Sequence, residues 1–418
     1  MALLLTNYSS ALKEIVLPYI RDNYPKDKIL VDQMKRNAGV TFINDEFIAP
    51  VRTSRHGGIA NLADDGNNVV SSSGASTSRG TVGVKIVTGA FDISRLAMDA
   101  SATSKGAVEA ALEFQAKTLT SDFGRHINRQ LYHDGYGVLS KVRASGGSVG
   151  TGTAAVELPD ANLDDGRSLD WYGTINGDIS PLKYLVAGLP IGIGTAGAAD
   201  GTIKAVTGTS ITLTSDIAIN ANDTVYSEDA SGEGAGTMEI EGIRAALSSS
   251  SGTSTYAGLA RTNTGWAPAF GSASEALTLS RMEDSYLSAR EYAMAGDTFI
   301  ILVNKSLFKK YGDILTAMRR SVNTADLLGG FKGLEFAAGD GNVGVFLDYD
   351  VPDGEMLVIN MDSWTLCQVR DLNWLESPNG EDLLRLQNTI TYQATLVWFA
   401  NAMCLAPAAN GRETRKTD

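Results

Sequence analysis

Several stretches of the sequence carry residue types that could do chemistry, and the first is a serine motif. Residues 146–150 read Gly-Gly-Ser-Val-Gly and match G-x-S-x-G, the nucleophile turn of α/β-hydrolases. That turn needs a buried strand before the serine and a helix after it, whereas Ser/Gly-rich sequence flanks this one on both sides. The three histidines, His56, His126 and His133, have no acidic partner placed to orient a general base, and we expect the last two to lie on a helix surface. The pattern favours a loop over a hydrolase.

Two further stretches could bind a nucleotide or a metal. Residues 192–197 match G-x-G-x-x-G, but β-like sequence follows, with no helix N-terminus to hold a pyrophosphate. A loose match to a calcium loop comprises Asp348, Asp350, Asp353 and Gly354. In that match Pro352 occupies a ligand position and Ile359 replaces the closing glutamate. We expect turns at both places, and therefore no catalytic residues, no cofactor and no metal.

The composition is that of a globular chain. Its 418 residues predict two or three domains, and the 43% apolar content is enough for real cores. The two cysteines, Cys367 and Cys404, lie in apolar neighbourhoods, which favours free thiols and synthesis in a reducing cytoplasm. Neither a long apolar run nor a signal peptide is present, so we expect no membrane span and no secretion by that route. The net charge of −13 disfavours tight binding of nucleic acid but is compatible with a wall around DNA.

The element that organises the chain is one long amphipathic helix predicted at 104–134. Its apolar residues recur at spacings of three and four and so line one face: Val108, Leu112, Ala116, Leu119, Phe123, Ile127 and Leu131. Ser101, Thr103 and Ser104 offer N-terminal capping hydroxyls, and Gly135 supplies the C-terminal stop. A helix of this length, roughly 45 Å, needs a long sheet or a neighbouring molecule along its apolar side.

The chain before this helix predicts an arm and a hairpin. Amphipathic helices are expected at 8–21 and 29–36, and they form either an arm that lies on another molecule or internal packing. Alternating β-branched sequence then predicts a long hairpin with a flexible tip at 64–80, whose apolar face is Phe47, Val51, Val82, Val84 and Ile86. A two-stranded element is too thin to bury that face, so we expect a neighbouring subunit to cover it.

After the helix, 140–235 differs in composition and predicts an inserted β-rich domain, a small barrel or sandwich. Strands alternate there between turns, at 202–206, 210–213 and 223–226. Replacing Ser148 should not affect assembly, because this region carries no expected catalytic role.

The remaining sequence predicts an α/β body followed by long strands. Helices are expected at 239–247, 278–295 and 307–319, around a buried strand at 298–304. Strands follow at 334–336, 343–347, 355–360, 364–369 and 383–402, and we expect the long helix to pack against them.

This order of parts, with several short motifs, resembles the major capsid protein of tailed bacteriophages, the Hong Kong 97-type fold. The motifs are 91–94 with 97–101 at the hairpin-to-helix junction, 242–244 with 256–261 and Trp266 at the opening of the axial domain, and 330–336, 348–354 and 371–374 on the returning strands. The resemblance covers most of the chain outside 140–235, and it depends on the order of motifs that are individually weak.

The resemblance implies an α+β fold with an arm (1–45), an extended hairpin loop (46–95), a spine helix of the peripheral domain (96–139), the inserted β-rich domain (140–235), an axial domain (236–337), peripheral strands (338–392) and a C-terminal return to the axial domain (393–418). It further implies pentamers and hexamers of this chain in the icosahedral shell of a virion, made in the host cytoplasm. Expected partners are a separate scaffolding protein, a portal, a decoration protein and packaged double-stranded DNA bound without sequence specificity. No membrane is involved.

Some relatives join subunits by a Lys–Asn cross-link. Lys85 is the one hairpin lysine and has no assigned acid partner, so we do not expect that bond. Two alternatives stay open: an encapsulin-like compartment, which shares the fold, and a hydrolase or sugar-binding protein with an appended β-domain. Particle size separates the second from a shell.

Overall fold

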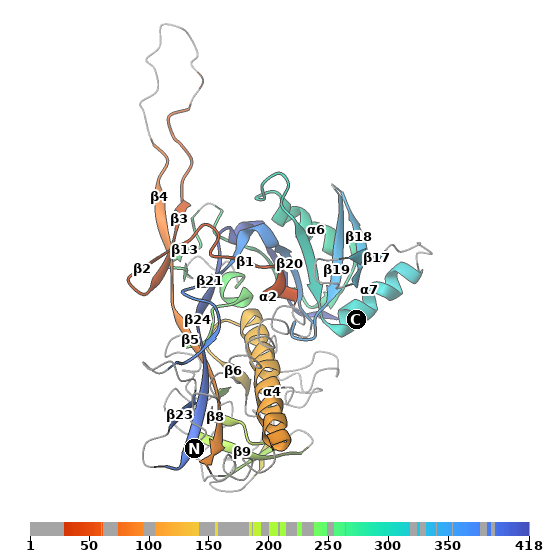
Figure 1. Ribbon diagram of the computed structural model, residues 1–418. Helices are drawn as coiled ribbons and strands as arrows, with labels where there is room; N and C mark the ends of the chain where they lie inside the picture. The colour runs from red at the N-terminus through yellow and green to blue at the C-terminus, as the bar shows by residue number, and fades with distance from the viewer. Residues whose placement is uncertain are drawn as a thin grey trace.

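The computed structural model describes residues 29–59, 61, 74–95, 105–141, 155–157, 184–185, 187–193, 200–207, 210–214, 224–227, 238–248, 255–263, 265–317, 324–326, 332–339, 341–352, 354–376, 383–385 and 389–417. Figure 1 shows a long sheet with one long helix along it, a hairpin projecting from one end of that sheet, and an α/β body at its side. The helix predicted at 8–21 and the motif at 146–150 lie outside the described residues. Among the described helices, none has both the length and the apolar character needed to cross a membrane.

The long helix is α4 (Lys105–Tyr132), as the sequence predicts. Ala116, Phe123, Ile127 and Leu131 of its expected apolar face are buried. Gly135 follows the helix with φ of 90°, a left-handed conformation that suits glycine and ends the helix where the sequence places its stop.

A six-stranded sheet lies under α4. Its central strand, β24 (Thr391–Cys404), pairs along one edge with β5 (Lys85–Ser94) over ten residue pairs. The other edge of β24 pairs with β21 (Trp364–Gln368), β22 (Asn373–Trp374) and β23 (Leu383–Arg385). At Gly89 an added Cβ would lie 3.1 Å from the Leu119 side chain of α4, so this glycine allows the helix to approach the sheet closely.

The hairpin consists of β3 (Glu46–Arg52) and β4 (Thr77–Gly83), with β2 (Thr41–Ile43) paired to β3. The expectation that a neighbour must cover its apolar face is wrong at the base, where Phe47 and Val82 are buried by their own chain. Thr81 N donates to Ala257 O at 2.9 Å, and Met403 of β24 packs over Gly80. Ile86 lies in β5, outside the hairpin, and is 61% exposed.

A seven-stranded sheet forms the α/β body. In spatial order its strands are β14 (Ala269–Gly271), β25 (Gly411–Glu413), β20 (Met356–Asn360), β16 (Phe299–Val303), β19 (Gly341–Leu347), β18 (Lys332–Ala338) and β17 (Thr324–Asp326). Helices α6 (Leu279–Arg290) and α7 (Lys305–Ala317) share a core with one face of the sheet, and the buried strand between them is where the sequence predicts it. The chain end returns to this sheet through β25, whose Arg412 forms a buried ion pair with Glu355 of the adjoining loop.

Three predicted strands have a different partner from the one expected. The strands at 334–336, 343–347 and 355–360 were expected under the long helix, but they belong to the seven-stranded sheet. The expected boundary between the axial domain and the peripheral strands, at 337/338, separates β18 from β19. These two strands are hydrogen-bonded neighbours in one sheet. Alternation in a sequence predicts that a strand exists, but it does not say which strand it pairs with, and this explains the error.

The region after α4 forms a further sheet with its own core, as its composition predicts. Its strands, in spatial order, are β6 (Val138–Lys141), β11 (Thr224–Ser227), β8 (Pro190–Ile193), β9 (Asp200–Thr207), β10 (Ser210–Leu213) and β7 (Ala155–Glu157). Ile191, Ile203, Ile211 and Val225 belong to a cluster separate from the other two cores. Entry strand β6 pairs with exit strand β11, so the two ends of this region lie side by side.

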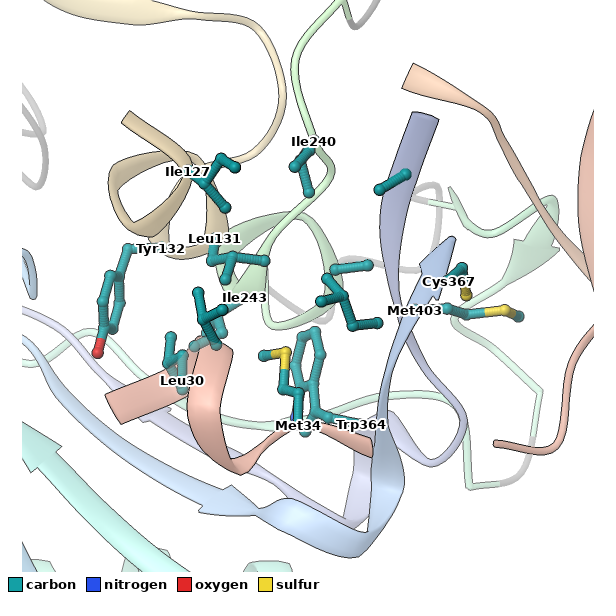
Figure 2. Packing of buried hydrophobic residues seen from close by; sticks show 14 of the residues in the cluster. Leu30, Met34, Ile127, Leu131, Tyr132, Ile240, Ile243, Trp364, Cys367 and Met403 are labelled. Carbon is teal, nitrogen blue, oxygen red and sulfur yellow. The ribbon is translucent and has the colours of Figure 1, made fainter. Parts of the chain in front are cut away.

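A short N-terminal helix fills the space between the two large sheets. It is α2 (Ile29–Gln33), and the predicted helix at 29–36 ends early because 35–36 forms β1 (Lys35–Arg36), parallel to β21. Figure 2 shows Leu30 and Met34 near Trp364 and the last turns of α4. Internal packing, one of the two alternatives for this segment, is therefore correct for 29–36.

The shorter elements are α5 (Ile243–Ala246), β12 (Thr255–Tyr256), β13 (Leu259–Ala260), β15 (Glu275–Ala276), β26 (Lys416–Thr417) and the 3-10 turns η1 (Met361–Ser363) and η2 (Pro407–Ala409). Helix α5 covers only part of the helix predicted at 239–247. Residues 238–240 before it are not helical, and their N–H groups bond to Gln130 of α4 and to Gly135 just after it.

Leu30→Ala tests the role of α2 between the sheets. Leu30 is fully buried, so truncation should lower the free energy of unfolding by about 2–5 kcal/mol, through lost burial and a cavity. Ile390→Ala is the matched control, because its side chain is 72% exposed and should change stability by no more than about 0.5 kcal/mol. Urea unfolding of both variants measures the difference, and equal stabilities would show that α2 is not part of the core.

Candidate assembly surface and the junction that supports it

The projecting hairpin offers an exposed face above its buried base. Side chains alternate along β3 and β4, so Phe47, Ala49 and Val82 point inward while the opposite face carries Ile48, Pro50, Arg52 and Arg79 together with Ile43 of β2. Pro50, Arg52 and Arg79 are exposed, and Ile43 is 48% exposed. Beyond the last ladder pair, Thr53 N donates to Ser76 O at 3.0 Å and Ser76 N to Ser54 Oγ at 2.9 Å. We call 50–59 with 74–79 the shaft.

The base of the hairpin is fixed to the body by polar contacts. Asn401 Nδ2 donates to Gly83 O at 2.7 Å, and Lys85 Nζ lies 3.5 Å from Glu241 Oε1. The expectation that Lys85 has no acid partner is therefore wrong. The pair is a noncovalent bridge within the chain, and both side chains are mostly buried, at 12% and 20% exposed.

Glu241 belongs to an irregular segment, 238–241, that we call the strut. Its four successive backbone N–H groups all find acceptors outside the strut. Met238 N and Glu239 N donate to Gly135 O at 3.1 and 3.0 Å. Ile240 N donates to Gln130 Oε1 at 3.3 Å, and Glu241 N to Asn401 Oδ1 at 2.9 Å. The strut thus connects the end of α4 to β24, and these bonds hold it in a non-helical conformation.

The strut and α4 come so close that the next residue must be glycine. An added Cβ at Gly242 would lie 2.2 Å from Leu131 O and 2.5 Å from Gln130 O, both backbone atoms of the last turns of α4. Backbone atoms cannot move aside as the end of a flexible side chain can. The absence of a side chain at Gly242 is therefore what allows the strut to lie against the helix.

A buried ion pair lies at the same place. Arg129 of α4 pairs with Glu239, with only 4% and 7% of the two side chains exposed, and Ser227 Oγ of β11 donates to the same carboxylate at 2.8 Å. Burial acts to raise the pKa of Glu239, but the charge and hydrogen bond of Arg129 outweigh it and lower that pKa. Removing one partner would leave the other charge buried and unpaired.

Two aspartates in the turn after β19 complete the junction. Tyr132 OH donates to Asp348 Oδ2 at 2.9 Å, Asn128 Nδ2 donates to Asp350 Oδ2, and Tyr184 OH donates to Asp350 Oδ1 at 3.4 Å. Burial, reinforced by Asp348, raises the pKa of Tyr132 well above its ordinary value, so this phenol remains a donor. These contacts join α4, the α/β body and the region after α4 in one buried polar cluster.

The residues considered for chemistry do not form an active site within the described part of the chain. His56 is exposed, and its Nδ1 accepts from Gly58 N at 3.1 Å. The expectation that His126 and His133 are surface residues is wrong, because His126 is partly buried and His133 buried. Asp348 and Asp350 lie in a turn, as expected, and no group of metal-ligating side chains is found among the described residues.

Gly192 and the two cysteines have structural surroundings. Gly192 lies in β8, where an added Cβ would lie 2.1 Å from the Tyr226 ring, and 194–199 fall outside the described residues. Cys367 and Cys404 are free and buried, as expected, and burial raises the pKa of both thiols to about 12. These thiols are therefore unreactive.

The comparisons with known proteins identify the fold. No family model matches the chain, and no curated protein does. Among solved structures, the capsid asymmetric unit of cyanophage A-1(L) is similar over 92% of this chain and 92% of that chain, with a TM-score of 0.51 and 12% identity. The native GTA particle capsid covers 94% of each chain at TM-score 0.44 and 10% identity, and Mycobacterium phage Patience covers 98% of this chain and 88% of that chain at 0.40 and 9%. The chain has an α+β fold similar to that of the cyanophage capsid chain, in agreement with the capsid fold that the resemblance predicts.

Gly242→Ala tests the close contact between the strut and α4. The new methyl group would overlap the backbone of Leu131, so the free energy of unfolding should fall by about 1–3 kcal/mol or more. Gly124→Ala is the matched control, because Gly124 lies within α4 with nothing within 4 Å of an added Cβ and should stabilise the helix by about 0.5–1 kcal/mol. Urea titrations would contradict this geometry if Gly242→Ala proved as stable as the unsubstituted protein.

Proposed function

We propose that this chain is the structural major capsid protein of a tailed double-stranded DNA bacteriophage, and that its copies assemble into an icosahedral shell. The observation that carries the proposal is the likeness to the cyanophage capsid chain over 92% of both chains. A shell protein needs interaction surfaces, not an active site, which agrees with the structural roles of the residues considered for chemistry. Pentamers and hexamers, a separate scaffolding protein, a portal and a decoration protein belong to the same proposal.

The shaft is the element that we expect to contact a neighbouring subunit. Its base is covered by its own chain, but the shaft extends beyond every other described element in Figure 1. An isolated two-stranded ribbon of this kind is marginally stable in water. Contact with a second copy would bury the exposed face that carries Ile43, Pro50, Arg52 and Arg79.

A complementary surface lies on the six-stranded sheet, on the face away from α4. Gly89 faces the helix, so Ile86, three residues earlier in β5, points to the opposite face, as do Val369 and Leu375 beside β24. These three side chains are 61%, 44% and 39% exposed. Asp92 and Asp371 are exposed nearby, with Arg36 paired to Asp371, while the hairpin face carries the exposed Arg52 and Arg79 together with Glu46. Opposite charges favour the correct register of two such surfaces.

The region 140–235 is proposed as an inserted domain that decorates or stabilises the shell. Its separate core and the pairing of β6 with β11 support this division. We expect replacement of 142–223 by an Asn-Gly turn to leave the rest of the chain folded, because Lys141 and Thr224 are already paired across the ladder. A single cooperative thermal transition followed by circular dichroism would support the division, and loss of that transition would contradict it.

Shortening the hairpin tests the part of the shaft beyond the ladder, and a substitution at Arg79 tests the face that the ladder carries. Replacing 53–76 by Asn-Gly keeps the ladder from Glu46 to Gly83, so the monomer should keep its melting temperature. The fraction of protein in particles tens of nanometres across, measured by sedimentation velocity and negative-stain microscopy with scaffold supplied, should fall sharply. Arg79→Glu should also lower that fraction, whereas Arg79→Lys, which keeps the charge, should lower it less. Small oligomers under every assembly condition from the unsubstituted chain would refute the shell function itself.

A further inference from the structure

His126 and Gln130 form a hydrogen-bonded pair one helical turn apart on α4, next to the strut. Gln130 Nε2 lies 2.7 Å from His126 Nε2, and Gln130 Oε1 lies 3.3 Å from Ile240 N. Ile240 is fully buried, so its N–H group has no access to water in the folded chain. The side chain of Gln130 is thus the link between His126 and the strut.

The direction of these bonds fixes the protonation state of His126. A backbone N–H can only donate, so the atom of Gln130 that faces Ile240 must be its oxygen. The amide nitrogen then faces His126 and donates, which requires Nε2 of His126 to be an acceptor. His126 is therefore neutral in this arrangement, with its proton on Nδ1.

The surroundings of His126 favour the neutral ring. Burial, followed by the positive charge of Arg129, lowers its pKa to about 4, and Glu239 acts in the opposite direction. Arg129 lies on the same helix and Glu239 on the strut, and the two pair with each other. These are the charged groups of the described residues that act on the ring.

We propose that His126 and Gln130 act as an acid-sensitive latch that holds the strut against α4 only while His126 is neutral. Protonation of Nε2 turns the acceptor into a donor, so two donors would face each other across the same contact. Turning the Gln130 amide over would satisfy His126, but it would set the amide nitrogen against the N–H of Ile240. In either case a buried donor loses its acceptor, which is costly.

Release of this latch would affect the elements that position the hairpin. The strut residue next to Ile240 is Glu241, whose N–H binds Asn401 and whose carboxylate lies against Lys85 of β5. Asn401 in turn holds Gly83 at the hairpin base. Protonation at one buried histidine would therefore loosen a connection that runs from α4 to the hairpin.

The sign of the effect on stability follows from the lowered pKa. The ordinary pKa of histidine, about 6.5, applies to the unfolded chain, which therefore binds a proton before the folded chain does. The stabilising contribution is complete above that value and is lost as the pH falls towards about 4. Between pH 7 and pH 4 this histidine should raise the unfolding equilibrium constant on the order of 100-fold.

His126→Gln separates the latch from the other titrating groups of the full-length protein. A glutamine at 126 can still accept from Gln130 through its oxygen, but it does not titrate. The unfolding equilibrium constant of each protein is measured in urea at pH 7 and at pH 4. We expect its rise between pH 7 and pH 4 to be smaller in the variant than in the unsubstituted protein, by a factor on the order of 100-fold. An equal pH dependence of the two proteins would overturn the proposal.

A second measurement is made on the unsubstituted protein. The chain has three histidines, so ¹⁵N-histidine labelling gives a simple spectrum in which His126→Gln serves only to assign one ring. His126 should show the Nδ1-protonated tautomer at pH 7 and titrate near pH 4, while exchange of the Ile240 amide should accelerate across the same range beyond the ordinary chemical dependence. Titration near pH 6.5, or the Nε2-protonated tautomer, would refute the latch.

Discussion

The rest of the structure depends on the burial of polar groups at the end of α4. This helix is amphipathic, yet its last turns have no solvent face: Asn128, Arg129, Gln130 and His133 are buried there. A helix end can be buried in this way only if most of its polar groups find partners, and here the partners come from three other parts of the chain. The strut supplies Glu239 and the Ile240 N–H group, the turn after β19 supplies its aspartates, and the region after α4 supplies Tyr184 and Ser227.

Because these partners are distant in sequence, the junction determines how the large elements lie relative to one another. Apolar residues also hold this junction together. One hydrophobic core contains α2, the last turns of α4 and a face of each large sheet. The hairpin base is bound to this core through Asn401 and Lys85. The shaft is different, because beyond Val51 it projects from a fixed base past the other described elements. A fixed base with an uncovered shaft suits a part that contacts another molecule.

The spacing of apolar residues predicted which helices and strands form better than it predicted which strands pair with each other. It identified α4, β16, the hairpin and the separate β-rich region, because each has a local pattern of apolar residues or turns. It did not place β19 and β20 beside β16, since pairing is set by contacts distant in sequence. It also assigned His126 and His133 to a surface, because a buried polar face and an exposed one have the same spacing. Gly242 before a short helix was a weak signal of the close contact, visible only once Leu131 was known to lie opposite.

Amide hydrogen exchange in free subunits and in assembled particles tests most directly whether the shaft is an assembly surface on a fixed base. We expect the amides of Phe47, Ala49 and Val82, which lie in the buried base, to be equally protected in both states. Amides of the shaft, such as Thr53 and Ser76, should exchange much more slowly in particles, because a neighbouring copy would exclude water from them. Equal exchange of the shaft amides in the two states would contradict a contact between the hairpin and a neighbouring subunit.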